Sequence, residues 1–187
     1  MFALVESESI TKTISGNRGV TIGDVQYPQN IFTLWSAAEK EAIGIYEIVH
    51  NNNNKRDEAF YTNTNVSYAF ADGVVTASYE SATAKSLADV TDEDDNVTLG
   101  LKSQKKEMIK QHASSLLTLN DWYVIKATEV ESYSVPEAMT TYRADVRTAS
   151  NDMESKIDAC TTVDELAALY VYTDDSRPLG EFPTLEV

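Results

Sequence analysis

The chain has very little of what small proteins use for covalent or metal-based stabilisation. Cys160 is the only cysteine in 187 residues, so no intrachain disulfide can form. The only histidines are His50 and His112, so a zinc site would need carboxylates spread along the chain. We therefore predict no metal and no cofactor, and we interpret Cys160 as a small core residue near a helix end.

Basic residues are also scarce. Lys and Arg number 15 against 30 Asp and Glu, which gives a formal net charge of −15. A charge of this sign repels polyphosphate, so we predict no nucleic-acid partner and expect a basic surface on whatever the protein binds. The one concentration of lysines, Lys102, Lys105, Lys106 and Lys110, is predicted to lie on a solvated helix face.

Long apolar runs and targeting features are missing as well. No segment approaches the ~20 consecutive apolar residues of a membrane-spanning helix, so we predict no membrane insertion. The first residues, Met1 to Glu8, carry no basic region ahead of their short apolar run. Synthesis in the cytoplasm of the expressing cell is the expectation.

Catalytic motifs are not found. The sequence has no phosphate-cradling glycine loop, no Gly-x-Ser-x-Gly elbow and no His-Glu-x-x-His. Asp92, Asp94 and Asn96 match the first ligands of a calcium loop, but Val97 replaces its glycine and Ser103 its final glutamate. We interpret this acidic segment as a solvated linker and predict that the protein is not an enzyme. A small hydrolase is the least favoured class, since carboxylate pairs cannot be recognised by spacing.

The first 88 residues have the pattern of an antiparallel β-rich module. Two pairs of strand-like segments flank a turn, and each pair predicts a hairpin. They are residues 20–27, with the turn Gly23-Asp24, and residues 66–79, with the turn Asp72-Gly73. Between them, Ser36 and Glu39 form a capping box that predicts one short helix, ended by Gly44 before a strand at 45–49. The polar run 51–58 predicts an exposed loop.

Residues 89–187 predict three helices. The first runs from Val97 or Leu101 to Leu117, with an apolar face formed by Leu101, Met108, Ile109, Leu116 and Leu117. The second begins at Pro136 and has the apolar stripe Met139, Tyr142, Val146, Ala149, Met153 and Ile157. A capping box at 162–165 opens the third, and an extended tail follows from Asp174. The fold class is α+β, with modules at 1–88 and 89–187.

Two tryptophan-centred segments resemble a known family. Leu116-Leu117 precede Asp121-Trp122 and a strand-like apolar run, and Pro136, Tyr142-Arg143 and Arg147 follow. A shorter segment has Tyr27-Pro28, Leu34-Trp35 and Ile43-Gly44-Ile45. This arrangement resembles the signature of bacteriophage tail-associated and tail-fibre-assembly proteins. The common form has Thr at the position of Asn120 and Arg at that of Lys126.

The resemblance implies a virion structural protein of the tail, baseplate or fibre-attachment apparatus, made in the host cytoplasm and acting by protein–protein docking. The alternative it implies is a tail-fibre assembly chaperone, absent from or substoichiometric in the mature particle. Implied partners are other phage tail or fibre proteins, and a homo-oligomer within the assembly is left open. The candidate partner interface consists of Trp35, Trp122, Tyr123, Tyr142, Arg143 and Arg147.

These candidate residues also have a purely structural interpretation, which we favour. Trp35 and Trp122 would anchor a small core where strand and helix meet, and Arg143 and Arg147 would pair with Asp121 or Glu137. Exposed edges of the same side chains could still contact a partner, because Trp, Tyr and Arg dominate interface energetics.

Overall fold

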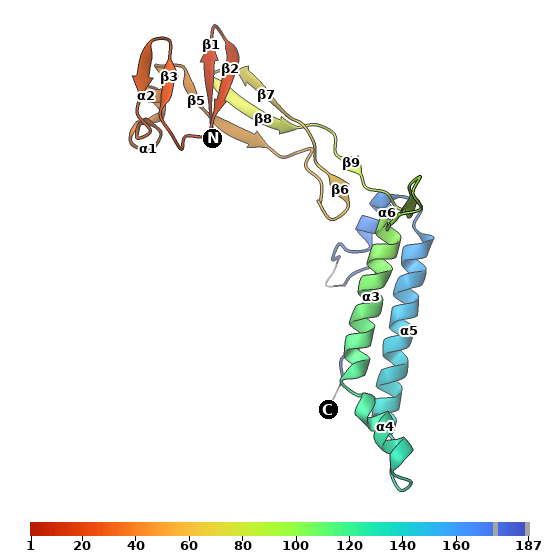
Figure 1. Ribbon diagram of the computed structural model, residues 1–187. Coiled ribbons are helices and arrows are strands. Elements are labelled where there is room, and N and C mark those ends of the chain that lie inside the picture. Colours follow the sequence, from red (N-terminus) through yellow and green to blue (C-terminus); the bar gives the residue numbers. More distant parts are fainter. Residues whose placement is uncertain (174–175, 186–187) are drawn as a thin grey trace. The chain divides into compact units, whose positions relative to one another are not determined.

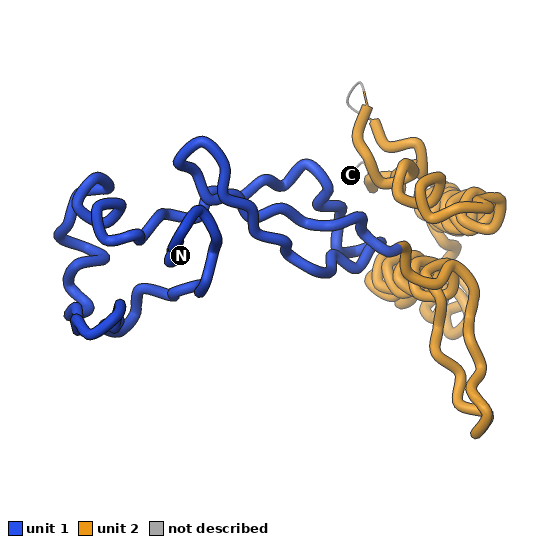
Figure 2. Tube along the Cα trace, turned by 90° about the horizontal axis from the view of Figure 1, so that it is seen from above, with its two compact units in different colours: residues 1–83 blue, residues 84–187 orange. Residues whose placement is uncertain are grey.

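The computed structural model describes residues 1–173 and 176–185 and confirms the α+β class. The chain separates into two compact units, residues 1–83 and 84–187, where the sequence predicts modules at 1–88 and 89–187 (Figures 1 and 2). Unit 1 is built mainly from strands and unit 2 mainly from helices. Each unit is described by itself below.

Unit 1 contains a five-stranded sheet in the order β2-β1-β5-β8-β7. Its strands are β1 (Phe2–Glu6), β2 (Ser9–Ile14), β5 (Ile45–Asn51), β7 (Val66–Ala71) and β8 (Val74–Tyr79). β5 pairs with β8 in parallel, so the predicted antiparallel module is wrong at this point and the sheet is mixed. The two strands can be parallel because β7 lies between them in sequence. β7 runs antiparallel to β8, so the chain reverses once more before β8 pairs with β5.

Both predicted hairpins are confirmed. β7 and β8 pair on either side of Asp72 and Gly73, whose φ values of 50° and 77° suit the twist of a two-residue turn. β3 (Val20–Ile22) and β4 (Val25–Tyr27) form the other hairpin, with Gly23 at φ 56°. The β1–β2 hairpin was not predicted, because its turn uses Ser7 and Glu8 at positive φ instead of the usual glycine or asparagine.

Two short helices occupy the place where the sequence predicts one. They are α1 (Ile31–Leu34) and α2 (Ala37–Glu41), and the predicted capping box opens α2 with Ser36 and Glu39. Gly44, at φ 80°, ends this region before β5, and a Cβ there would lie 2.7 Å from the Val5 carbonyl oxygen. A larger residue therefore cannot replace Gly44 without moving β1.

Unit 1 has two small cores on opposite sides of β1, as the alternation of side chains along a strand requires. One contains Leu4, Ile14, Val20, Ile31, Phe32 and Ile45, with Trp35 and Tyr27 packed against it. The other contains Ala3, Val5, Ile48, Val75 and Ala77, with Phe70 and Tyr46 beside it. The remaining short strands are β6 (Tyr61–Thr62) and β9 (Thr83–Ala84).

The described residues of unit 2 form four helices instead of the predicted three. They are α3 (Leu101–Thr118), α4 (Asp121–Glu129), α5 (Glu137–Ala159) and α6 (Val163–Ala168), the last opened by the predicted capping box of Thr162 and Glu165. The acidic segment is a hairpin tip between β10 (Val90–Thr91) and β11 (Val97–Thr98), not a linker. The Asp92 carboxylate accepts hydrogen bonds from the backbone N–H groups of Asp94 and Asn96, both at 2.9 Å.

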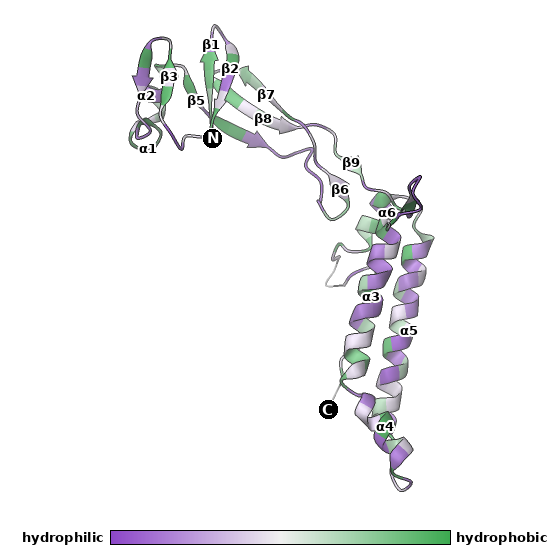
Figure 3. Cartoon of the chain, viewed as in Figure 1, coloured by the Kyte–Doolittle hydropathy of each residue, from purple (hydrophilic) through white to green (hydrophobic). Residues whose placement is uncertain are grey.

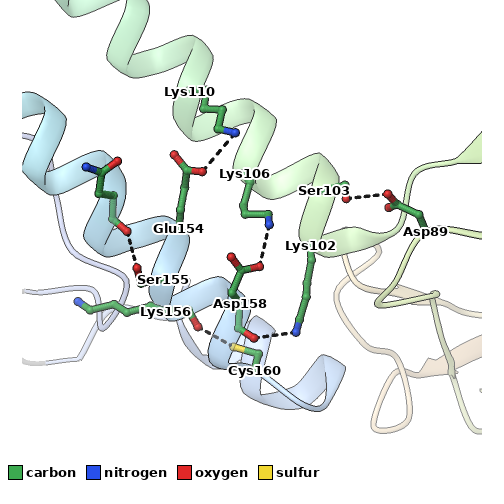
Figure 4. A network of polar contacts seen from close by, with 11 residues as sticks. Asp89, Lys102, Ser103, Lys106, Lys110, Glu154, Ser155, Lys156, Asp158 and Cys160 are labelled. Carbon is green, nitrogen blue, oxygen red and sulfur yellow. Dashed lines mark hydrogen bonds and ion pairs between the residues drawn. The ribbon is translucent and has the colours of Figure 1, made fainter.

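Helices α3 and α5 are joined by lysines of α3 that reach acceptors on α5 (Figure 4). Lys102 Nζ donates to the Asp158 carbonyl oxygen at 2.9 Å, and Lys106 Nζ lies 2.7 Å from Asp158 Oδ1. Lys110 Nζ lies 3.3 Å from Glu154 Oε2. The predicted solvated lysine face is thus an interhelical contact at these positions, because the acids of α5 lie opposite.

The apolar stripe predicted for the second helix is buried in α5 at Met139, Tyr142, Val146, Met153 and Ile157. On α3, Leu101 and Ile109 are buried as predicted, whereas Met108 is 59% exposed. Cys160 is buried at the C-cap of α5, as predicted. No helix within 1–173 and 176–185 is long and apolar enough to cross a membrane.

The C-terminal segment lies against these helices. Lys156 Nζ donates to the carbonyl oxygens of Pro178 and Leu179, and Phe182 packs edge-on against His112 with ring centroids 4.7 Å apart. Residues 181–185 form neither helix nor strand. Asp174, where the predicted extended tail begins, lies outside the described residues.

We predict that Asp89 supplies the N-terminal cap of α3 and makes unit 2 sensitive to acid. Its carboxylate accepts from the Gly100 N–H at 2.7 Å and Ser103 Oγ at 3.0 Å, and the Gly100 hydrogen bond, followed by that of Ser103, lowers the pKa of Asp89. A lowered folded-state pKa contributes stability above the unfolded value of 3.8, and that stability is lost as pH falls through the folded value.

The test is urea unfolding followed by helical circular dichroism at several acidic pH values. Asp89→Asn should unfold more easily than the native chain at neutral pH, and the difference should shrink at and below about pH 3.8. Asp94→Asn is the matched control, because no hydrogen bond or ion pair joins its side chain to α3 among the described residues. A constant difference at every pH would contradict the capping role.

Candidate docking surface

One guanidinium joins three helices of unit 2. Arg143 of α5 is 8% exposed. Its Nη1 donates to the Leu117 carbonyl oxygen at 2.8 Å, and its Nη2 lies 2.7 Å from Asp121 Oδ1. Leu117 is in the last turn of α3, where carbonyl groups have no intrahelical partner, and Asp121 is the first residue of α4. Of the two predicted partners, Asp121 and Glu137, the structure pairs Arg143 with Asp121.

The turn between α3 and α4 is held by Asn120, which is buried. Its side-chain amide donates to the Leu116 carbonyl oxygen at 3.1 Å, and its backbone N–H donates to the Leu117 carbonyl oxygen at 3.0 Å. Its own carbonyl accepts from the Tyr123 N–H at 3.3 Å. These bonds satisfy the end of α3 and start α4 in a new direction without glycine or proline.

Helix α4 turns few of its apolar side chains inward. None of its residues is fully buried, and Tyr123 is the one that packs against the core of Ala113, Met139, Tyr142 and Val146. Ile125, two residues further, points about 200° around the helix and is 55% exposed. Trp122 is 49% exposed, so the expectation that it anchors a core beside a strand is wrong: the segment is helical and its indole faces outward.

The exposed apolar residues of α4 and its flanks form what we call the α4 surface. Figure 3 shows hydrophobic residues within α4, at one end of the α3–α5 pair. The surface comprises Leu119, Trp122, Val124, Ile125 and Val130. Isolated exposed apolar side chains are common, but several of them on one short helix and its two ends are more typical of protein interaction sites.

The charges around the α4 surface are mainly acidic. Lys126 Nζ lies 4.3 Å from the ring centroid of Tyr133 and 5.9 Å from that of Trp122, so aromatic faces attract this cation. Glu129 and Glu131 are exposed and make no ion pair with any described residue. A partner with basic groups around an apolar site would therefore complement this end of unit 2.

The six predicted interface residues do not share one environment. Trp35 belongs to unit 1, where it packs edge-on against Tyr27 at 6.0 Å between centroids. Tyr142 and Arg143 are buried, and Arg147 donates to the Arg143 carbonyl oxygen at 3.0 Å. Trp122 and Tyr123 stack with their ring centroids 3.7 Å apart. Of the six residues, these two lie on or beside the α4 surface. Sequence reasoning missed Leu119, Val124 and Ile125.

The titratable groups with perturbed pKa values belong to local structure. Burial, followed by Glu165, raises the pKa of Cys160, which keeps its thiol protonated and unreactive. Hydrogen bonds from Ser36 and from Thr161 lower the pKa values of Glu39 and Glu165 at their capping boxes. Among residues 1–173 and 176–185, no group of three or more His, Cys, Asp or Glu side chains is placed to hold a metal ion.

No protein-family model, curated protein or solved structure matches the chain.

We predict that the Arg143 contacts stabilise unit 2 much more than those of its neighbour. Arg143→Met keeps most of the aliphatic stem but leaves the Leu117 carbonyl and Asp121 without this partner, and should lower the unfolding free energy by about 2–3 kcal/mol. Arg147→Met is the matched control and should cost less than about 1 kcal/mol, since it removes one bond to a backbone carbonyl. Urea unfolding followed by helical circular dichroism measures both. Equal losses of unfolding free energy in the two variants would show that Arg143 is not the junction of the three helices.

Proposed function

We propose that the protein is a non-enzymatic structural component of a bacteriophage tail, baseplate or fibre-attachment apparatus, and that it acts by docking to a neighbouring tail protein through the α4 surface. The observation that carries the docking role is the set of exposed apolar side chains on α4 and its flanks, on a helix that a buried arginine joins to its neighbours. The resemblance of the Asp121-Trp122 and Tyr142-Arg143 segment to phage tail-associated proteins supports the assignment to a virion.

The mechanism is burial of the α4 surface in an apolar site on the partner. Each fully buried valine, leucine or isoleucine side chain contributes roughly 1.5–3 kcal/mol, which suffices for specific binding when several act together. Arg143 fixes the orientation of α4 before binding, so little conformational entropy is lost on docking. The acidic rim of Glu129 and Glu131 favours basic partners and opposes self-association at this site.

The location is tested by quantitative peptide mass spectrometry of gradient-purified particles of the phage that encodes the chain. A structural component should be present at a fixed ratio to the major capsid protein in every preparation. Absence from particles, combined with abundance in the infected-cell lysate, would overturn this assignment and favour the tail-fibre assembly chaperone.

The docking surface is tested by Ile125→Lys, which keeps a good helix former but places a charge on the α4 surface. We predict at least about a tenfold loss of the chain from particles, since an interface worth 1.4 kcal/mol less binds about tenfold more weakly. Val171→Lys is the matched control, because Val171 is also in unit 2 and is 57% exposed against 55% for Ile125.

Both variants should retain the native circular dichroism spectrum, since neither side chain is buried. Equal incorporation of Ile125→Lys and Val171→Lys would exclude α4 as the docking surface, whatever the copy number of the native chain.

A further inference from the structure

Unit 2 contains a small hollow of about 140 Å³ lined by residues of α3, of α5 and of the C-terminal segment. Its apolar lining includes the buried side chains of Ile109, Met153 and Leu179. Met108, the exposed member of the predicted apolar face of α3, lines it as well. An apolar cavity of about 150 Å³ can hold one benzene molecule. The hollow therefore suits a single ring-sized or branched apolar group.

Arg177 lines this hollow as a cation without a counter-ion. Its Nε is enclosed and has no hydrogen-bond partner, and among residues 1–173 and 176–185 it is the one enclosed side-chain nitrogen or oxygen in that condition. The guanidinium carbon lies 5.4 Å from the ring centroid of Tyr172, and no hydrogen bond or ion pair joins the guanidinium to a described residue. An enclosed donor without an acceptor costs free energy, because its hydrogen bonds to water are lost and not replaced. An anion beside the guanidinium would offset this cost.

The other ionisable groups around the hollow also favour an anion. Lys105 and His112 line it together with Arg177, and none of the described residues that line it is acidic. Lys105 Nζ lies 4.9 Å from the ring centroid of Tyr170, and the His112 ring packs edge-on against Phe182. The chain has 30 acids against 15 bases, so most of its surface repels anions. This hollow is a local exception to that repulsion.

A carboxylate fits these surroundings better than a phosphate. The planar guanidinium presents a fork of N–H donors that matches the two oxygens of a carboxylate. A phosphate would bring further charged oxygens against the buried side chains of Ile109 and Met153, where no donor could satisfy them. A carboxylate attached to one apolar group can place its charge at Arg177 and its apolar part against the apolar lining.

We propose that this hollow is a binding site for a small monocarboxylic acid that carries one compact apolar group. The carboxylate lies at the Arg177 guanidinium, and the apolar group packs against Ile109, Met153 and Leu179. The volume of the hollow limits the ligand to about the size of a single ring. The site belongs to unit 2 alone, and it does not depend on the phage assignment or on the α4 surface.

The site is tested by titrating benzoate into the full chain labelled with ¹³C at its methionine methyl groups. Of the four methionines, Met108 and Met153 line the hollow, whereas Met139 packs in another core. The methyl signals of Met108 and Met153 should shift and saturate together, with a dissociation constant of about 1 mM or tighter, and that of Met139 should not move. No saturable shift at benzoate concentrations well above this value, or an equal shift at Met139, would overturn the proposal.

The role of charge is tested on the native chain with benzamide, which has the shape of benzoate without its charge. Benzamide should bind about tenfold more weakly, because hydrogen bonds to a charged group are the stronger ones.

Arg177→Gln should weaken benzoate binding by a similar factor and remove the preference over benzamide. Lys110→Gln is the matched control, since it removes the same charge from a residue of unit 2 that does not line the hollow, and benzoate affinity should be unchanged. Circular dichroism should show the native helical content in both variants. Equal affinities for benzoate and benzamide in the native chain, or equal benzoate affinities of the two variants, would exclude Arg177 as the carboxylate-binding group and overturn the proposal.

Discussion

The arrangement of the helical unit depends on the charge-assisted contacts of Arg143. The end of α3 and the start of α4 place a carbonyl oxygen and a carboxylate near each other, and the guanidinium from α5 donates to each of them from a separate nitrogen atom. A lysine could not reproduce this geometry, because its ammonium lacks the planar fork of donors. Since α4 buries so little apolar area itself, its orientation relies on this junction, on Asn120 and on Tyr123.

Local sequence signals predicted much of the fold. Turn residues such as Asp72-Gly73, capping boxes such as Ser36 with Glu39, and the apolar stripe of α5 act within a few residues, so they can be recognised without tertiary information. The parallel pairing of β5 with β8 could not be predicted in this way, because it joins segments separated by a loop and another strand. The turn at Ser7 and Glu8 was missed because tertiary pairing overrides their weak preference for positive φ.

The candidate site was likewise predicted only in part. The Arg143–Asp121 pair is one of the two alternatives, Asp121 or Glu137, that opposite charge predicted, and the sequence alone could not choose between them. The apolar run after Trp122 was misinterpreted, because continuous apolar residues are equally compatible with a buried strand and an exposed short helix. Only the position of Tyr123 against the core shows which side of the segment faces inward, and therefore that Ile125 and Trp122 face outward.

The parallel β5–β8 pair also determines the order in which the sheet can assemble. β7 and β8 are adjacent in sequence and can close as a hairpin on the order of 1–10 μs. β5 can join them only after the chain between Asn51 and Val74 has closed into a loop, which costs entropy before any contact forms. During synthesis, the C-terminal half of β5 therefore leaves the ribosome well before its partner strand and stays unpaired until β8 follows.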